Sequence, residues 1–269
     1  MSTDLKTYIS QKRSQSSLGL MTHMVAGYPD FETNLKLAKV FEQKKAELLE
    51  IQLPFSDPLA DGPVIMRANQ MALQKGACLK NCFAFVKELS QTINLPIVIM
   101  TYYNLPYHMG LEKFFKECEK SGASGLIVPD ILFDEQRENF YGRMEKFKIQ
   151  PIPVFSPTMD QKRLTQALNY FTNSLKNKPP IIYATLRVGT TGEKYTIDPK
   201  GLSLLKKIKK QSALPIAAGF GLSSPKQLVA LKENAEIAVL GSHLIRLLEQ
   251  GGISAVADFI ELCDQTLKN

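Results

Sequence analysis

Two carboxylates, one shortly before a proline-rich run and one within it, are the side chains best suited to acid–base chemistry in this sequence of 269 residues. Glu50 belongs to the largely apolar segment 47–53, in which successive side chains of an extended chain alternate between two faces. One face is wholly apolar, whereas Glu50 lies on the other face, between Leu48 and Gln52. A buried carboxylate is costly unless a site solvates it, so Glu50 is a candidate general acid–base. The alternative is a strand end at which Glu50 is simply turned toward solvent.

Asp61 follows in the run 54–63, which contains three prolines, one glycine and two aspartates. Asp57-Pro58 and Asp61-Gly62 are turn-forming pairs, and we interpret Asp57 as a turn residue. Asp61 is open to two interpretations. It is either a second turn residue or a carboxylate that a loop carries to the mouth of an active site.

Glycine-bearing segments at 187–192, 219–223 and 241–242 follow late apolar runs. Their backbone N–H groups are not covered by side chains, and Gly241-Ser242 leads directly into a helical pattern. Helix N-termini and such loops bind phosphate groups, although turn glycines also occur without a ligand. Three of them at successive strand ends favour a phosphate site.

Further polar side chains lie at or near predicted strand ends. Tyr102 and Tyr183 are suited to forming the wall of a pocket for a planar substrate, although a tyrosine in a strand is often simply packed in the core. Asp130 is another candidate polar contact. His23 lies inside the first predicted strand, and we interpret it as a core or pocket-lining residue because the spacing places no acid partner beside it.

Short apolar runs alternate with amphipathic segments along the chain, which predicts strands that alternate with helices. A single (β/α)8 TIM barrel over residues 1–269, with an extra N-terminal helix and additional short helices, accommodates this order; a doubly wound open sheet is the competing architecture. The predicted strands are 19–25, 48–53, 96–102, 125–129, 151–155, 180–186, 215–219 and 237–240. The predicted helices are 31–45, 78–92, 111–121, 134–147, 161–174, 200–211, 225–232, 243–250 and 253–267.

Composition narrows the function classes. The net charge of +7 comes from lysines scattered over helix faces, without an aromatic RNA-binding signature, so we expect no nucleic-acid partner. Cys78 and Cys82 stand four apart without partners at zinc spacing, so no metal is predicted. No apolar stretch approaches the length of a membrane span, and the N-terminus lacks the apolar region of a signal peptide. We therefore expect a cytoplasmic protein with no membrane contact.

These residues resemble the tryptophan synthase α subunit family over essentially the whole chain. Glu50 followed by the run 54–63 carries the resemblance, because the match to the family signature is nearly unbroken. Supporting segments stand in the same order at 27–29, 102–104, 128–130, 189–192, 219–221 and 241–242.

The resemblance implies a lyase of tryptophan biosynthesis that cleaves indole-3-glycerol phosphate to indole and glyceraldehyde 3-phosphate. It assigns the principal acid–base role to Glu50, and to Asp61 it assigns acceptance of the indole N–H. It implies substrate contacts for Tyr102, Asp130, Tyr183, Thr191 and Phe220, and phosphate binding by Gly192, Gly221, Gly241 and Ser242. It further implies an α2β2 hetero-tetramer in which pyridoxal phosphate belongs to the β subunit, with no cofactor in the α chain.

Several positions depart from the family pattern. Gln52 replaces a glycine and, by strand alternation, should intrude into the pocket or hydrogen-bond across it. His23 replaces an aromatic residue. Further departures are Tyr28, Leu132-Phe133, Leu186 and Thr190. Gln52 and His23 motivate an alternative, an α-like chain with weak lyase activity that acts mainly as an allosteric partner of the β subunit. A third possibility is another barrel enzyme acting on a related sugar phosphate.

Overall fold

The structure is a computed structural model that describes residues 5–13, 18–135, 137–175, 178–187, 197–219 and 221–268. In this described part of the chain, nine short strands form one parallel sheet in the order β5-β4-β3-β2-β1-β9-β8-β7-β6. The strands are β1 Gly19–Val25, β2 Leu48–Gln52, β3 Ile97–Met100, β4 Ala123–Ile127, β5 Gln150–Pro151, β6 Val154–Phe155, β7 Ile182–Thr185, β8 Ile216–Gly219 and β9 Ile237–Leu240.

The two ends of this strand order belong to one stretch of chain. β5 pairs with β4 and β6 pairs with β7, and only Ile152 and Pro153 separate the two strands. Ile152 N donates to Leu126 O at 3.0 Å, and Pro153 O accepts from Tyr183 N at 2.9 Å. The sheet is therefore continuous around a barrel, which confirms the predicted (β/α)8 fold and excludes the open doubly wound sheet.

The single strand predicted at 151–155 is wrong in one respect, because it is divided into β5 and β6. Pro151 and Pro153 have no backbone N–H, so this segment cannot donate an unbroken ladder of hydrogen bonds to its neighbours. The segment instead turns from one neighbour to the other within two residues.

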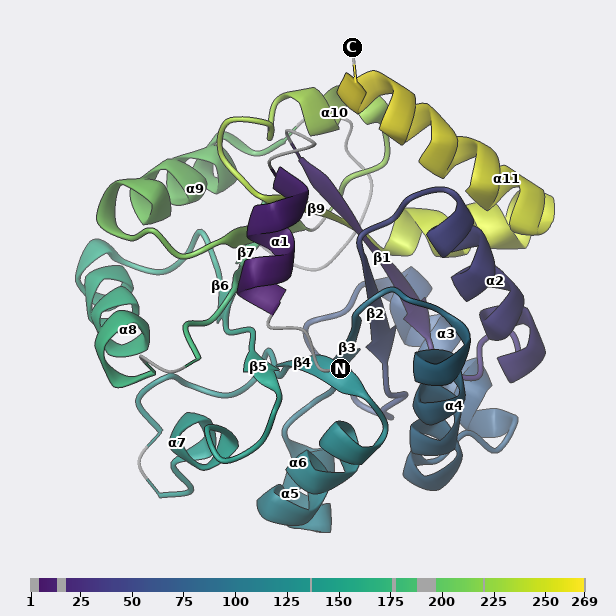
Figure 1. Cartoon of the computed structure of the whole chain (residues 1–269), viewed down its shortest axis with the longest axis horizontal. Helices are drawn as coiled ribbons and strands as arrows, with labels where there is room; N and C mark the ends of the chain where they lie inside the picture. Colours follow the sequence, from purple (N-terminus) through teal and green to yellow (C-terminus); the bar gives the residue numbers. More distant parts are fainter. Residues whose placement is uncertain are drawn as a thin grey trace.

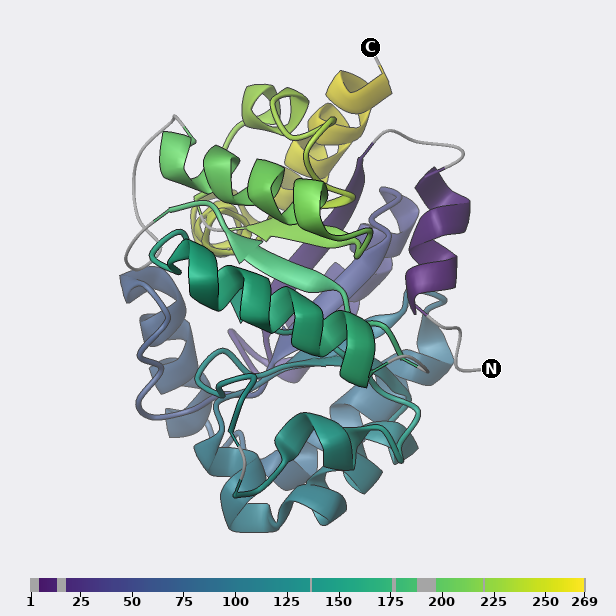
Figure 2. The same cartoon turned by 90° about the vertical axis from the view of Figure 1, so that its left-hand side faces the viewer.

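Helices surround the sheet, as Figure 1 and Figure 2 show, and α1 lies across one end of the barrel. Leu5 and Ile9 of α1 pack with Met21 and Leu48 in the cluster that fills the barrel. The opposite end, at the carboxyl ends of the strands, is where a barrel carries its chemistry. The helices are α1 Leu5–Arg13, α2 Phe31–Gln43, α3 Pro63–Gln74, α4 Leu79–Thr92, α5 Asn104–Met109, α6 Leu111–Lys120, α7 Phe140–Met144, α8 Gln161–Ser174, α9 Pro199–Gln211, α10 Pro225–Val229 and α11 Ser242–Lys268.

Three helices differ from the predicted pattern. α3 is absent from the predicted helices, although Pro63 takes the first helical position, where a missing N–H costs nothing. α7 covers only five residues of the predicted 134–147, because Asn139 has φ +46 and the helix begins after it. α5 is likewise absent from the predicted helices. The two predicted C-terminal helices, in contrast, are confirmed, because Gly252 inside α11 has a non-helical φ of +68 and ψ of −161 and separates two helical segments.

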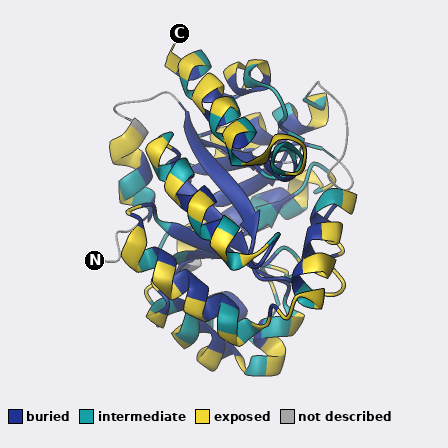
Figure 3. Ribbon diagram, turned by 90° about the vertical axis from the view of Figure 1, so that its right-hand side faces the viewer, coloured by how far each residue is buried: buried dark blue, intermediate teal, exposed yellow. Residues whose placement is uncertain are grey.

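The hydrophobic residues form two layers. One cluster lies inside the barrel, and a larger one lies between the sheet and its helices; Figure 3 shows the buried sheet under helices whose outer faces are exposed. Met21 and Leu48 belong to the inner cluster, so His23 and Glu50, two positions further along the same strands, share the inner face. Within the described residues, no helix has both the length and the apolar character needed to cross a membrane.

Candidate active site

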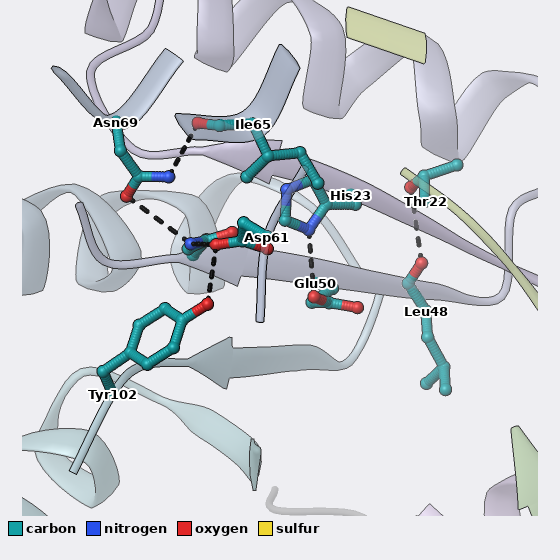
Figure 4. Close-up of polar contacts among 9 residues, drawn as sticks. Thr22, His23, Leu48, Glu50, Asp61, Ile65, Asn69 and Tyr102 are labelled. Atoms are coloured by element: carbon teal, nitrogen blue, oxygen red, sulfur yellow. Dashed lines mark hydrogen bonds and ion pairs between the residues drawn. The ribbon is translucent and has the colours of Figure 1, made fainter. Parts of the chain in front are cut away.

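Glu50 lies inside the barrel near the carboxyl end of β2, as strand alternation predicts. Glu50 is 5 % exposed, so the alternative in which its side chain is turned toward solvent at a strand end is wrong. In the parallel pairing of β1 with β2, Glu50 stands opposite His23. His23 Nδ1 lies 2.9 Å from Glu50 Oε1, and Figure 4 shows this contact between the two strands.

The interpretation of His23 as a core or pocket-lining residue is confirmed, because it is buried and lines a cavity. The absence of an acid partner, inferred from sequence spacing, is wrong. The partner is distant in sequence but adjacent across the ladder, and spacing along one chain segment cannot reveal it. Among the residues that the structure describes, His23 Nε2 and Glu50 Oε2 have no hydrogen-bond partner, although both atoms are buried.

Asp61 is also buried, at 5 % exposure, and is held by two side chains. Gln52 Nε2 donates to Asp61 Oδ2 at 2.7 Å, and the Tyr102 hydroxyl donates to the same oxygen at 2.9 Å. Figure 4 shows the contact of Tyr102 with Asp61. The Tyr102 hydroxyl in turn accepts from Ala60 N at 3.1 Å, which fixes the loop that carries Asp61. The prediction that Gln52 hydrogen-bonds across the pocket is confirmed.

Asp57, in contrast, is exposed and belongs to a turn. Its carbonyl accepts from Leu59 N at 2.9 Å, and its carboxylate accepts from the Ser56 hydroxyl. The structure thus separates the two aspartates of the run 54–63, because only Asp61 turns its carboxylate into the barrel.

The electrostatics of the site follow from burial. Burial lowers the pKa of His23, but the attraction of Glu50, its hydrogen bond and the charge of Asp61 outweigh that effect, so the pKa is raised. Burial raises the pKa of Asp61, while the hydrogen bonds from Gln52 and Tyr102 and the charge of His23 oppose the rise. Burial also raises the pKa of Tyr183 well above its usual value, helped by the charges of Glu50 and Asp61. The charges of Glu50 and Asp61 therefore act on the pKa values of both His23 and Tyr183.

A cavity of about 330 Å³ opens at the carboxyl ends of the strands. His23, Glu50, Gln52 and Asp61 line it, together with Tyr183 of β7. An apolar part of its wall is suited to a flat hydrophobic ring. Its other lining residues are Leu59, Ala60, Ile65, Met100, Ile127, Pro129, Val154, Ser156, Thr185, Arg187, Gly221, Leu222, Val239, Gly241 and Ser242.

One side of this cavity is suited to an anion. Gly221 follows β8, and Gly241 and Ser242 lie at the N-terminal end of α11, where backbone N–H groups and the helix dipole favour negative charge. Arg187 adds a cation here, and its Nη1 lies 3.1 Å from where a Cβ on Gly221 would stand. The sequence pattern alone does not single out Arg187, although it begins the glycine-bearing segment 187–192.

The remaining predicted site residues are distributed unevenly. Among the described residues, neither Tyr102 nor Asp130 lines the cavity. Tyr102 holds Asp61, whereas Asp130 accepts a hydrogen bond from Tyr103 N at 2.9 Å. Their direct contact with substrate stays a prediction. Thr191, Gly192 and Phe220 lie outside the described residues.

The described residues contain no group of three or more His, Cys, Asp or Glu side chains positioned to hold a metal ion. The chemistry that this arrangement supports is proton transfer by Glu50, charge stabilisation by Asp61 and anchoring of an anionic group on the opposite side. The apolar wall lies between these polar regions.

Comparison with known proteins agrees with this geometry. Residues 9–269 match the family model described as tryptophan synthase alpha chain. The tryptophan synthase alpha chain of Desulfotalea psychrophila is 35 % identical over 95 % of this chain and 98 % of its own length. The tryptophan synthase alpha chain of Helicobacter hepaticus is 37 % identical over 86 % of each chain.

Solved structures are similar over nearly the whole fold. A chain from the tryptophan synthase α2β2 complex of Pyrococcus furiosus has a TM-score of 0.82 at 28 % identity and covers 93 % of this chain and 98 % of its own. A chain of Mycobacterium tuberculosis tryptophan synthase has a TM-score of 0.88 at 23 % identity, covering 98 % of each, and supports the fold alone. The family match over 9–269 and the curated relatives together show that this chain belongs to the tryptophan synthase alpha chain family.

Proposed function

We propose that this chain is a lyase that cleaves indole-3-glycerol phosphate to indole and glyceraldehyde 3-phosphate. The observation that carries the proposal is the pair of buried carboxylates, Glu50 and Asp61, in one cavity with an anion-binding side. Family membership supplies the reaction, and the cavity offers a place for each part of the substrate.

The chemistry assigns different work to the two carboxylates. Glu50 in its acid form gives a proton to indole C3, which leaves positive charge on the ring. Asp61 accepts a hydrogen bond from the indole N–H and stabilises that charge. Glu50 then takes the proton of the glycerol hydroxyl on the carbon attached to C3. The bond from this carbon to C3 breaks, its electron pair returns to the ring, and the hydroxyl oxygen becomes the aldehyde oxygen.

The phosphate is assigned to the opposite side of the cavity. Gly221, Gly241 and Ser242 offer backbone amides there, and Arg187 contributes positive charge. Gly192, Thr191 and Phe220 stay assigned to phosphate and substrate by the resemblance. With the phosphate held here, the indole ring lies along the apolar wall next to Asp61.

A tryptophan synthase β subunit is the proposed partner, in an α2β2 tetramer in which the β subunit carries pyridoxal phosphate and the α chain carries no cofactor. Large apolar side chains are exposed in segments that follow the carboxyl ends of strands: Leu59 is 85 % exposed, Leu132 is 61 % and Met66 is 47 %. Exposed apolar residues of this size are typical of protein contact surfaces. We expect such a chain to act in the cytoplasm.

Indole release from indole-3-glycerol phosphate, measured with and without the cognate β subunit, tests the proposal. We expect release from the native chain and its near-complete loss in Glu50→Gln, with binding of glycerol 3-phosphate within a few-fold of native. Asp57→Asn is the matched control, because Asp57 is an exposed carboxylate in the same loop region. No indole from the native chain with β subunit present would overturn the proposal.

The same assay separates the alternative of a mainly allosteric α-like chain. If Glu50→Gln loses lyase activity but still stimulates the β reaction as strongly as native, regulation is a separable property. If the native chain stimulates the β subunit without releasing indole, the allosteric alternative is correct.

A further inference from the structure

The imidazole of His23 and the carboxylate of Glu50 form a buried pair inside the barrel. The two residues are opposite each other in the β1–β2 register and are 4 % and 5 % exposed. His23 Nδ1 and Glu50 Oε1 are 2.9 Å apart, which is ordinary hydrogen-bonding distance. An ionised carboxylate only accepts hydrogen bonds, so beside ionised Glu50 the proton lies on Nδ1, and the same hydrogen bond persists when Glu50 carries its own proton on Oε2.

The two polar atoms of the pair that do not contact each other remain available to a ligand. Glu50 Oε2 and His23 Nε2 are buried and have no hydrogen-bond partner among the described residues, and both side chains line the cavity. One carboxylate oxygen is thus fixed by the imidazole while the other is left for the substrate. A carboxylate fixed through one oxygen loses rotational freedom and presents the other in a defined direction.

We propose that His23 is a positioning residue for the lyase reaction, which holds Glu50 through Oε1 and so leaves Oε2 as the oxygen that carries the proton for the substrate. This inference rests on the proposed function. It assigns a chemical role to the position at which the sequence departs from the aromatic residue of the family pattern.

The proton inventory of the reaction explains why this arrangement is useful. Glu50 must hold a proton when substrate binds, because its first act is to protonate indole C3. With Oε1 accepting from the imidazole, the proton of the acid form lies on Oε2, which has no hydrogen-bond partner among the described residues and belongs to a side chain that lines the cavity.

The charges around the pair favour a protonated imidazole, which donates from Nδ1. Burial lowers the pKa of His23, but the hydrogen bond and charge of Glu50 and the charge of Asp61 raise it by more, so the net shift of the pKa is upward. The other ionisable side chains that line the cavity are Tyr183 on β7 and Arg187 beyond the end of that strand.

Two substitutions test this orientation. His23→Asn places an amide donor near the position of Nδ1, whereas His23→Phe fills the space without a donor. We expect His23→Phe to lower kcat by roughly 10- to 100-fold with KM within about threefold. His23→Asn should recover most of kcat, because it restores a donor to Glu50 Oε1.

Thr22→Val is the matched control. Thr22 is the preceding residue of β1, is fully buried, and its side chain points to the other face of the strand. The substitution should leave kcat unchanged. If His23→Phe keeps kcat within twofold, or if His23→Asn loses as much kcat as His23→Phe does, the positioning role is wrong.

An independent measurement does not need lyase activity. Imidazole nitrogen chemical shifts of the ligand-free protein, followed by NMR over pH, should show His23 titrating above the usual histidine value in the native chain and at lower pH in Glu50→Gln. An unchanged titration in Glu50→Gln overturns the proposal. An inactive native chain with the expected titration overturns the proposed function while leaving the coupled pair established.

Discussion

Gln52 donates a hydrogen bond of 2.7 Å from Nε2 to Oδ2 of Asp61, and this contact joins the last residue of β2 to the loop that follows it. Both side chains are buried, and Gln52 Oε1 has no partner among the described residues. Position 52, where the family pattern has glycine, thus carries a side-chain amide that holds the candidate catalytic carboxylate of Asp61 in place.

Replacing Gln52 with glycine should change the acidic side of the pH–rate profile. The hydrogen bond from Gln52 lowers the pKa of Asp61 against the effect of burial, so its removal should raise that pKa further. Asp61 acts as an anion, so kcat/KM of Gln52→Gly should begin to rise at higher pH than in the native chain. Gln52→Met is the matched variant, because it keeps the side-chain volume but has no amide donor, and its kcat/KM should rise at the same higher pH as that of Gln52→Gly. Gln52→Glu is unsuitable because it adds a charge. A profile that superimposes on the native one would exclude this role for Gln52.

The Tyr102 hydroxyl joins Asp61 Oδ2 to Ala60 N, so Tyr102→Phe should loosen the loop without changing the aromatic packing. Phe55 stacks on the Tyr102 ring at 5.5 Å and would be retained. We expect a loss of about 1 to 2 kcal/mol in the free energy of unfolding, since Asp61 and Ala60 N each lose a buried partner. Urea titration measures this loss, and Tyr107→Phe, at a largely exposed ring, is the control. Equal stability of the two variants would contradict the assignment.

The sequence predicted the barrel and the direction of Glu50 because both follow from local periodicity. Apolar runs of strand length define the sheet, and alternation along β2 puts Glu50 on the face opposite Leu49 and Ile51. The same alternation predicted that Gln52 reaches the pocket.

Contacts between segments that are distant in the sequence could not be predicted from local periodicity. His23 meets Glu50 only through the β1–β2 register, and the inward position of Asp61 depends on Tyr102, which follows β3. The division of the fifth strand depends on which neighbour each residue meets, and α3 starts at a proline that is also a turn signal. Each incorrect prediction therefore concerns either a contact between segments that are distant in the sequence or a residue, such as Pro63, that is compatible with both a turn and the start of a helix.

Asp61→Asn should reduce turnover and stabilise the protein at the same time. The loss of negative charge beside the indole nitrogen acts in the transition state, so kcat should fall by about 100-fold or more with KM within a few-fold. Steady-state kinetics of indole release measures this, and an equal change in kcat and in substrate dissociation would contradict it.

The stability effect follows from the raised pKa of Asp61. A carboxyl group whose pKa is higher in the folded state stabilises the fold when protonated, and this stabilisation is lost as the pH rises through the folded pKa. At neutral pH the native chain therefore carries the cost of an ionised buried carboxylate, which the Asp61→Asn variant avoids. We expect this variant to have the higher Tm at pH 7 and the two proteins to converge at about pH 3, below the ordinary pKa of aspartate. A lower Tm of the variant than of the native chain at pH 7 would contradict the expected direction of the stability change.

Gly221→Ala tests the assignment of the phosphate side. Gly221 has φ +87, and an added Cβ would lie 3.1 Å from Arg187 Nη1 and 3.2 Å from its Cδ. The substitution therefore strains the backbone by about 1 to 2 kcal/mol and displaces the cation of the proposed anion site. We expect KM for indole-3-glycerol phosphate and the dissociation constant of glycerol 3-phosphate to rise together by about tenfold, while kcat changes little, because the reacting carboxylates are on the other side of the cavity. Gly110→Ala is the control, since Gly110 has the same φ of +87 in open space. If Gly110→Ala weakens phosphate binding as much as Gly221→Ala does, backbone strain alone explains the effect and the phosphate side is wrongly assigned.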